Sequence, residues 1–309
     1  MIVPVGADKP RLRRSVLTRL GAFLPSLGPA RAIARVPFGV YWKVIRLRER
    51  VAAARPSRAF VVLAFVLAGC GGSSDSIDKP PPPGVAERCG EHVKAEALWF
   101  RASDGNLLDG ALLGQGERGI VLAHGYPGDV CGELGTGQWL AQRGFRVLVF
   151  DFRGYGLSPR APTHEAINRL SADLQGASEL LRDRGATKVF LVGESFGGSA
   201  VVGSEPRLDP APDGVVSLGG PADLSFAGFG PDLNGLAAAR EIRAPLLILA
   251  GREDGHVDVG DLRTIVRRAP TEDKRLLLYP GHYHAGALLF DAPYRARPRA
   301  ALLEFLRTR

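Results

Sequence analysis

The segment Lys188-Val-Phe-Leu-Val192, followed by Gly193-Glu194-Ser195-Phe196-Gly197-Gly198, contains the pattern that decides the fold. A short apolar run is typical of a strand buried on both faces, and the small residues after it indicate a sharp turn into a helix. Glycines two positions before and after Ser195 leave room for this turn to pass close to neighbouring backbone. The sequence therefore predicts that Ser195 lies at the carboxyl end of a buried strand. Because the chain has 39 glycines, this spacing also arises by chance and needs support from other segments.

Similar apolar runs recur along the chain after residue 95. The first two flank Ser103-Asp104-Gly105-Asn106, a turn signal that predicts an antiparallel hairpin. The later runs alternate with helical patterns, which are clearest at 167–184 and 259–268. This alternation predicts an α/β domain with a doubly wound, mostly parallel sheet and helices on both faces. The predicted strands are 96–100, 107–113, 119–123, 146–150, 188–192, 214–218, 245–250 and 274–279.

Residues whose side chains can take part in catalysis follow several of these strands. Ligands of doubly wound sheets bind outside the carboxyl ends of the strands, so the first residues of each loop are the candidates. His124-Gly125-Tyr126-Pro127-Gly128 follows the third strand, and Gly251-Arg252-Glu253-Asp254 follows the seventh. Pro280-Gly281-His282-Tyr283-His284 follows the last. Together with the turn at Ser195, these loops bring a serine, carboxylates and histidines to one edge of the sheet.

These loops resemble those of the α/β-hydrolases, and the resemblance covers roughly residues 93–309. The turn at Ser195 is similar to the nucleophile elbow of that superfamily, which implies that Ser195 is the catalytic nucleophile. The resemblance also implies that the backbone N–H groups of Tyr126 and Phe196 form the oxyanion hole. The expected fold is therefore the α/β-hydrolase fold. Since only 26 residues, 219–244, separate the sixth and seventh strands, no large lid domain is expected.

The same resemblance selects the carboxylate and the histidine that would act together with Ser195. Superfamily members usually place the acid fourth in a Gly-x-x-Asp segment, which selects Asp254 and leaves Glu253 as the competing carboxylate. The histidine commonly stands three residues after the glycine of Pro-Gly, which selects His284 over His282. Two histidines at i and i+2 can also bind a metal, but no cysteine or carboxylate cluster supplies the remaining ligands. We therefore expect no metal, and the predicted residues need no cofactor. His256, two residues after Asp254, is only a weak further candidate.

The predicted residues imply a serine hydrolase that cleaves a small carboxylic ester through an acyl-enzyme intermediate. Two alternatives stay open. The first is a peptidase or amidase of the same fold, because the resemblance extends to prolyl-peptidase-like domains as well as to dienelactone-hydrolase-like proteins. The second is a catalytically idle hydrolase fold that serves as a binding lipoprotein of the cell envelope, because a fold does not dictate its function.

The N-terminal region has the layout of an export signal: Arg55 and Arg58 precede the apolar run 59–67. Leu67-Ala68-Gly69-Cys70 resembles the lipobox of bacterial lipoproteins, which implies lipidation of Cys70 and anchoring to a membrane. A run of nine apolar residues is too short for a bilayer span, which needs about 20. We predict a lipoprotein at the bacterial cell envelope, with a signal peptide at 51–69, a flexible, proline-rich tether at 70–90 and the hydrolase domain at 91–309.

The positive charge of the chain lies almost entirely in its front end. The whole chain carries +8, but residues 1–69 hold 13 Lys and Arg against 2 Asp and Glu, which leaves the remainder at −3. No surface for nucleic acid is therefore expected. Residues 1–50 form a basic extension, which we interpret as the result of a translation start assigned too far upstream. A real cytoplasmic extension and a basic amphipathic segment on anionic lipid are the alternatives.

Cys89 and Cys131 remain once Cys70 is lipidated. An oxidising envelope permits these two cysteines to pair. Their disulfide would join the end of the tether to the loop after the third strand, and closing a loop of about 43 residues contributes about 4 kcal/mol by the chain-entropy estimate. Two separate buried thiols are the alternative.

Overall fold

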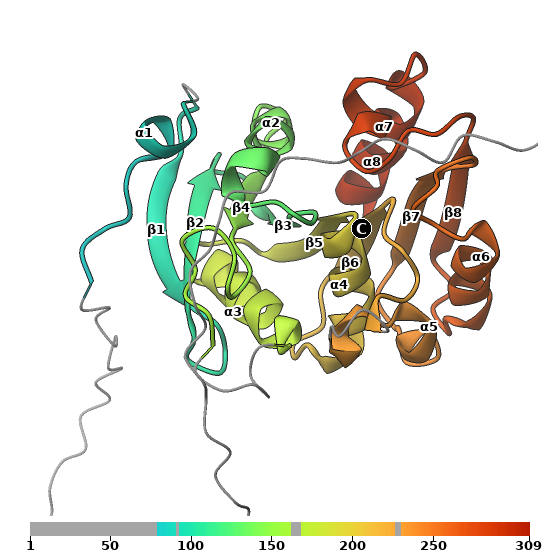
Figure 1. Ribbon diagram of the computed structural model, residues 1–309, viewed down its shortest axis with the longest axis horizontal. Coiled ribbons are helices and arrows are strands. Elements are labelled where there is room, and N and C mark those ends of the chain that lie inside the picture. The colour runs from blue at the N-terminus through green and yellow to red at the C-terminus, as the bar shows by residue number, and fades with distance from the viewer. Residues whose placement is uncertain (1–78, 91–92, 162–167, 226–229) are drawn as a thin grey trace, which may run out of the picture. The chain divides into compact units, whose positions relative to one another are not determined.

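The computed structural model describes residues 79–90, 93–161, 168–225 and 230–309 (Figure 1). The predicted basic extension, signal peptide and lipidated Cys70 lie outside the described residues and stay predictions. No helix in the described part of the chain is long and apolar enough to span a bilayer.

Eight strands form one sheet in the order β1-β2-β4-β3-β5-β6-β7-β8. The first two pairings, β1 with β2 and β2 with β4, are antiparallel, and all the others are parallel. The predicted hairpin and the predicted doubly wound, mostly parallel sheet are therefore confirmed. The strands are β1 (Glu96–Arg101), β2 (Leu107–Leu113), β3 (Arg118–Ala123), β4 (Arg146–Phe150), β5 (Lys188–Glu194), β6 (Gly214–Leu218), β7 (Leu246–Gly251) and β8 (Lys274–Tyr279).

Helices cover both faces of this sheet (Figure 1). The core on one face contains side chains of α3 (Leu170–Asp183), α4 (Phe196–Ser204) and α6 (Val259–Arg268). The core on the other face contains side chains of α2 (Val130–Ala141), α7 (Ala287–Phe290) and α8 (Ala296–Thr308). Successive residues of β5 alternate between the two cores. Burial on both faces explains why the central strands are continuously apolar rather than alternating.

The segment between β6 and β7 contains only short elements among its described residues, namely the 3₁₀ turn η3 (Pro231–Leu233) and helix α5 (Gly235–Ala238). A second 3₁₀ turn, η1 (Glu205–Arg207), follows α4. The prediction of a fold without a large lid agrees with this. Strand β7 begins at Leu246, one residue later than predicted, because Pro245 has no N–H group to donate to a neighbouring strand.

The short helix α1 (Val85–Cys89) packs on the hydrolase domain. Its Val85 side chain is buried in the core beside α2, and Arg88 forms an ion pair with the fully buried Asp109. Cys89 forms a disulfide with Cys131 in α2, with their Cα atoms 5.3 Å apart. Residues at the end of the predicted tether are thus fixed to the domain both covalently and by packing.

Candidate active site

Ser195 lies on the turn between β5 and α4 and has a backbone conformation that is rare for a residue with a side chain. Its φ is 50° and its ψ is −113°. Such a conformation costs roughly 1–3 kcal/mol and persists only when the surroundings enforce it. One enforcing contact is the hydrogen bond that the Ser195 N–H donates to the Leu218 carbonyl of β6, at 2.9 Å. The turn therefore displays the Ser195 hydroxyl at the carboxyl end of the sheet.

The two glycines flanking Ser195 are required by close backbone approach. A Cβ atom on Gly193 would lie 2.2 Å from the carbonyl oxygen of Gly197. A Cβ atom on Gly197 would lie 2.2 Å from the carbonyl oxygen of Ala123. Both distances are far inside van der Waals contact, so only glycine fits either position. The Gly-x-Ser-x-Gly pattern thus has a steric origin here.

Three of the predicted residues form a hydrogen-bonded chain. The Nε2 atom of His284 lies 2.8 Å from the Ser195 hydroxyl oxygen, and its Nδ1 atom lies 2.7 Å from Oδ2 of Asp254. Asp254 is only 4% exposed, whereas the side chains of His284 and Ser195 are partly accessible. In this arrangement the imidazole can accept the serine proton while the carboxylate accepts the Nδ1 proton.

The two competing residues lie away from this chain of hydrogen bonds. His282 is exposed, and its ring stacks on Tyr283 with the centroids 5.3 Å apart. Glu253 is exposed as well, although it directly precedes the aspartate. The structure thus brings His284 and Asp254 to Ser195, and it does not bring His282 or Glu253 there.

His256 lies closer to the site than the sequence indicated. Its backbone N–H donates to Oδ1 of Asp254 at 3.0 Å, and its ring centroid is 4.4 Å from that of His284. The spacing of two residues after an aspartate is the signal for the backbone hydrogen bond, since Asp side chains commonly accept from the N–H two positions on. The ring contact has no such sequence signal.

The loop after β3 lies against the nucleophile. A Cβ atom on Gly125 would lie 3.4 Å from that of Ser195, and Tyr126 is the next residue. Phe196 is the first residue of α4, and the N–H groups of a first helical turn point outward along the helix axis. The two residues predicted to form the oxyanion hole therefore both border Ser195.

His124 has a structural role in this loop. Its Nδ1 atom lies 2.8 Å from the Gly125 carbonyl oxygen, and its Nε2 atom accepts the Phe152 N–H at 3.2 Å. This pairing requires the neutral form with the proton on Nδ1. Burial lowers the pKa of His124, which favours the same neutral form. The ring thus fixes the loop beside Ser195.

Aromatic side chains cluster around Phe196, the residue that follows Ser195. The ring of Phe196 lies 5.8 Å from the rings of Phe152 and Tyr155 and 6.4 Å from that of Tyr126. Phe152 and Phe196 are buried in the core, whereas Tyr126 is 62% exposed. The cluster therefore presents an aromatic surface to solvent at Tyr126.

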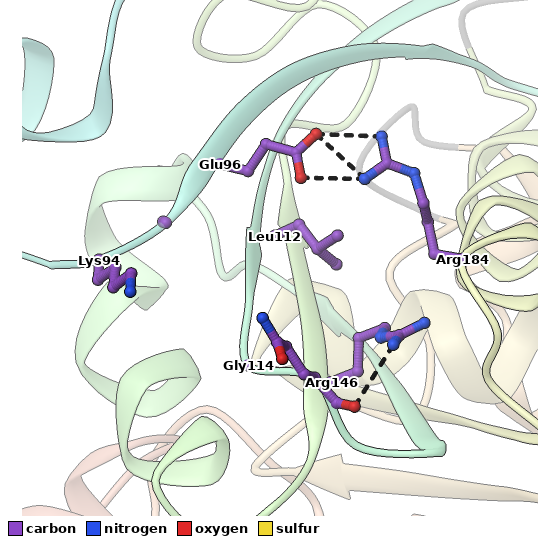
Figure 2. Close-up of a pocket in the computed structure, with 8 residues that line it drawn as sticks. Lys94, Glu96, Leu112, Gly114, Arg146 and Arg184 are labelled. Atoms are coloured by element: carbon purple, nitrogen blue, oxygen red, sulfur yellow. Dashed lines mark hydrogen bonds and ion pairs between the residues drawn. The ribbon is translucent and has the colours of Figure 1, made fainter.

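A cavity of about 760 Å³ lies elsewhere in the domain, and its lining includes residues at the amino ends of β1 and β4 (Figure 2). Arg184 and Glu96 pair across it at 3.0 Å, and Arg146 donates to the Gln115 carbonyl at 3.4 Å. None of its lining residues belongs to the Ser195, His284 and Asp254 chain. Within the described residues, no three His, Cys, Asp or Glu side chains are grouped as metal ligands. The elbow therefore remains the candidate active site.

The fold, with a serine, a histidine and an aspartate hydrogen-bonded at the carboxyl ends of its strands, defines an α/β-hydrolase. The sequence profile of the family described as serine aminopeptidase, S33, matches residues 115–222 and 234–291, more than half of the chain. The chain belongs to this family, and it is a hydrolase.

Relatives and solved structures extend this comparison. The uncharacterized protein YfhR of Escherichia coli O157:H7 is 30% identical over 221 residues, which are 62% of this chain and 74% of that protein. Among solved structures, an esterase of Pyrococcus furiosus matches with a TM-score of 0.59 at 18% identity, over 74% of this chain and 96% of the other. A monoacylglycerol lipase of Paleococcus ferrophilus matches with a TM-score of 0.54 at 21% identity, over 64% and 98% of the two chains. At these identities the structural matches show the fold.

Proposed function

We propose that the protein hydrolyses small carboxylic esters with Ser195 as nucleophile, His284 as general base and acid, and Asp254 as the orienting carboxylate. The observation that carries this proposal is the continuous hydrogen-bonded chain from the Ser195 hydroxyl through His284 to Asp254. The similar solved structures include an esterase and a monoacylglycerol lipase, which favours an ester over other acyl substrates.

The reaction has two halves. Ser195 attacks the ester carbonyl while His284 takes its proton, and the same imidazolium then protonates the departing alcohol. Asp254 stabilises the positive charge that forms on the ring. Water, activated by the neutral His284, next attacks the acyl-enzyme and releases the acid. The proposed reaction requires no cofactor.

Charge on the carbonyl oxygen develops in both halves. In the proposal, the backbone N–H groups of Tyr126 and Phe196 donate to this oxygen. Removing one such donor typically costs about 3–4 kcal/mol in the transition state. The exposed Tyr126 ring, next to the Gly125 backbone that lies against Ser195, would offer apolar surface to an uncharged acyl group.

The proposal includes a location at the bacterial cell envelope, with the domain anchored through lipid on Cys70. The lipobox-like segment supports it, and so does the Cys89–Cys131 disulfide, because structural disulfides persist in oxidising compartments. Mass spectrometry of the mature protein tests the location: the N-terminal peptide should start at a diacylglyceryl Cys70. A Cys70→Ser variant should lose this modification, and an unmodified peptide from within 10–45 would contradict the cleavage.

Peptide hydrolysis is the second candidate, because the family to which the chain belongs is that of serine aminopeptidase, S33. It uses the same residues and differs only in the leaving group. Comparing kcat/KM for a p-nitrophenyl ester and an aminoacyl p-nitroanilide separates the two candidates. A higher kcat/KM for the anilide would contradict the ester proposal and favour peptide hydrolysis.

The test of the whole proposal is covalent labelling with a fluorophosphonate probe together with turnover of a p-nitrophenyl ester. Wild type should label and turn over, and Ser195→Ala should do neither while keeping its thermal stability. Ser178→Ala is the matched control, because the Ser178 hydroxyl only donates to the Leu174 carbonyl within α3. A folded wild type that fails to label would favour the idle binding protein.

A further inference from the structure

Two glutamates lie buried beside the elbow. Glu194 directly precedes Ser195 at the end of β5, and Glu133 belongs to α2, on the face of the sheet that α7 also covers (Figure 1). Their exposures are only 7% and 6%. Burying a carboxylate is costly unless hydrogen bonds or a proton compensate for the lost water. The mechanism proposed above uses neither side chain.

The contacts of Glu194 lead to the histidine loop. Its Oε1 accepts the Thr136 hydroxyl at 2.9 Å, and its Oε2 accepts the Gly286 N–H at 2.8 Å. Gly286 stands two residues after His284. A Cβ atom there would lie 2.6 Å from Oε2 of Glu194, so a larger residue would displace the Glu194 carboxylate. Glu194 therefore fixes the loop that carries the catalytic histidine.

The contacts of Glu133 lead to the oxyanion loop. Its Oε1 accepts the Gly125 N–H at 3.3 Å, and Gly125 precedes Tyr126. Its Oε2 is buried and has no hydrogen-bond partner among the described residues. Burial, together with the charge and hydrogen bonding of Glu194, raises the pKa of Glu133 to about 9. Glu133 thus keeps its proton at neutral pH.

Glu194 is the better place for the negative charge of the pair. Burial raises the pKa of Glu194 above its ordinary value, and the hydrogen bonds from Thr136, Glu133 and Gly286 and the charge of His284 offset only part of this rise. The titratable groups that act on the pair are the two glutamates themselves and His284. Glu194 accepts two hydrogen bonds and Glu133 accepts one, so a negative charge is better compensated on Glu194 than on Glu133.

We propose that Glu133 and Glu194 are positioning residues: two buried carboxyl groups, of which Glu133 holds the oxyanion loop at Gly125 and Glu194 holds the histidine loop at Gly286. This inference rests on the proposed function. The single negative charge on Glu194 stabilises the imidazolium that His284 becomes during the attack, in addition to Asp254. A second negative charge, formed when Glu133 loses its proton, repels the first and disturbs both loops.

The test is the pH profile of kcat and kcat/KM for ester hydrolysis by the full chain between pH 6 and pH 10. Glu194→Gln should lower kcat about 10- to 100-fold with little change in KM, because misplaced catalytic groups cost factors of this size. Wild type should lose activity as the pH rises through about 9, and Glu133→Gln should remove this alkaline fall.

Glu205→Gln is the matched control. Glu205 is 2% exposed and accepts the N–H groups of Arg243 and Ala244, so it is an equally buried glutamate remote from the elbow. It should leave the profile unchanged. If Glu194→Gln fails to fold, Thr136→Val removes one donor from Glu194 and should lower kcat in the same direction.

Profiles of the Glu133 and Glu194 variants that superimpose on an active wild type would overturn the role of the pair alone. A wild type that neither labels with fluorophosphonate nor hydrolyses the ester would overturn the proposed function itself, and the inference with it.

Discussion

The ring of His256 packs against the ring of His284, with the centroids 4.4 Å apart and the planes inclined by 42°. The same residue donates its backbone N–H to Asp254. His256 thus contacts both the predicted base and the predicted acid, and it limits the space in which the base can rotate.

Replacing His256 by Ala should lower kcat/KM for a p-nitrophenyl ester about 10-fold, because the unsupported His284 ring samples other rotamers. The backbone hydrogen bond to Asp254 persists in this variant, so the loss isolates the ring contact. His282→Ala is the control, since that ring stacks on Tyr283 instead, and it should be close to wild type. Equal activity of both variants would contradict the role of the His256 ring.

Gly197→Ala should destabilise the fold by at least about 2 kcal/mol, because its Cβ atom would collide with the Ala123 carbonyl oxygen at 2.2 Å. Gly135→Ala is the matched substitution. Gly135 is an exposed position of α2 with open space around it, and alanine there should stabilise by about 0.5–1 kcal/mol. Urea unfolding of both variants measures the contrast, and equal effects would refute the steric account of the elbow.

Reducing the Cys89–Cys131 disulfide should lower the free energy of unfolding by about 2–4 kcal/mol, because the bridge restricts a long loop of the unfolded chain. The total decrease in the free energy of unfolding should be larger when Arg88 is also replaced by Ala, since the buried Asp109 then loses its charged partner. Thermal unfolding with and without reductant checks the first effect. A double Cys→Ser variant with unchanged Tm would contradict it.

The stability of the protein should depend on pH through Glu133. Its ordinary pKa of 4.5 applies to the unfolded chain, and burial raises the pKa to about 9 in the folded chain. Between these values the folded chain holds a proton that the unfolded chain has released. The contribution of Glu133 is therefore fully present below pH 4.5 and is lost progressively as the pH rises toward 9.

Glu133→Gln has no such proton to lose. The free energy of unfolding of wild type should therefore fall relative to that of this variant between pH 5 and pH 8. Urea titrations of both proteins at several pH values measure the difference. Two parallel curves would mean that Glu133 does not hold a proton in the folded state.

The sequence predicted the sheet and the loops around Ser195 because both depend on short segments. Continuous apolar runs specify strands buried on both faces, and a glycine two positions from Ser195 on either side specifies the tight turn. Asp254 and His284 were selected by the resemblance to the α/β-hydrolases, which usually place the acid and the histidine at these positions of the loops after two strands. The structure brings these three residues to one another.

Contacts across the fold had no such signal. Glu133 and Glu194 come from α2 and β5, and nothing in either segment indicates that the two carboxyl groups share one buried space. The contact between His256 and His284 likewise depends on how the loops after β7 and β8 pack. The Cys89–Cys131 pairing also stayed open in the sequence, because spacing alone does not show whether two thiols approach each other.

His284 lies in the loop after β8, which is the edge strand at one end of the sheet. Every residue of β8 is only partly buried. Strands at a sheet edge open with less free energy than central ones. We expect fraying of β8 to separate His284 from Ser195, which is fixed at the end of the central β5. Heating should therefore inactivate the enzyme before circular dichroism detects unfolding, and cooling should restore activity without refolding of the core.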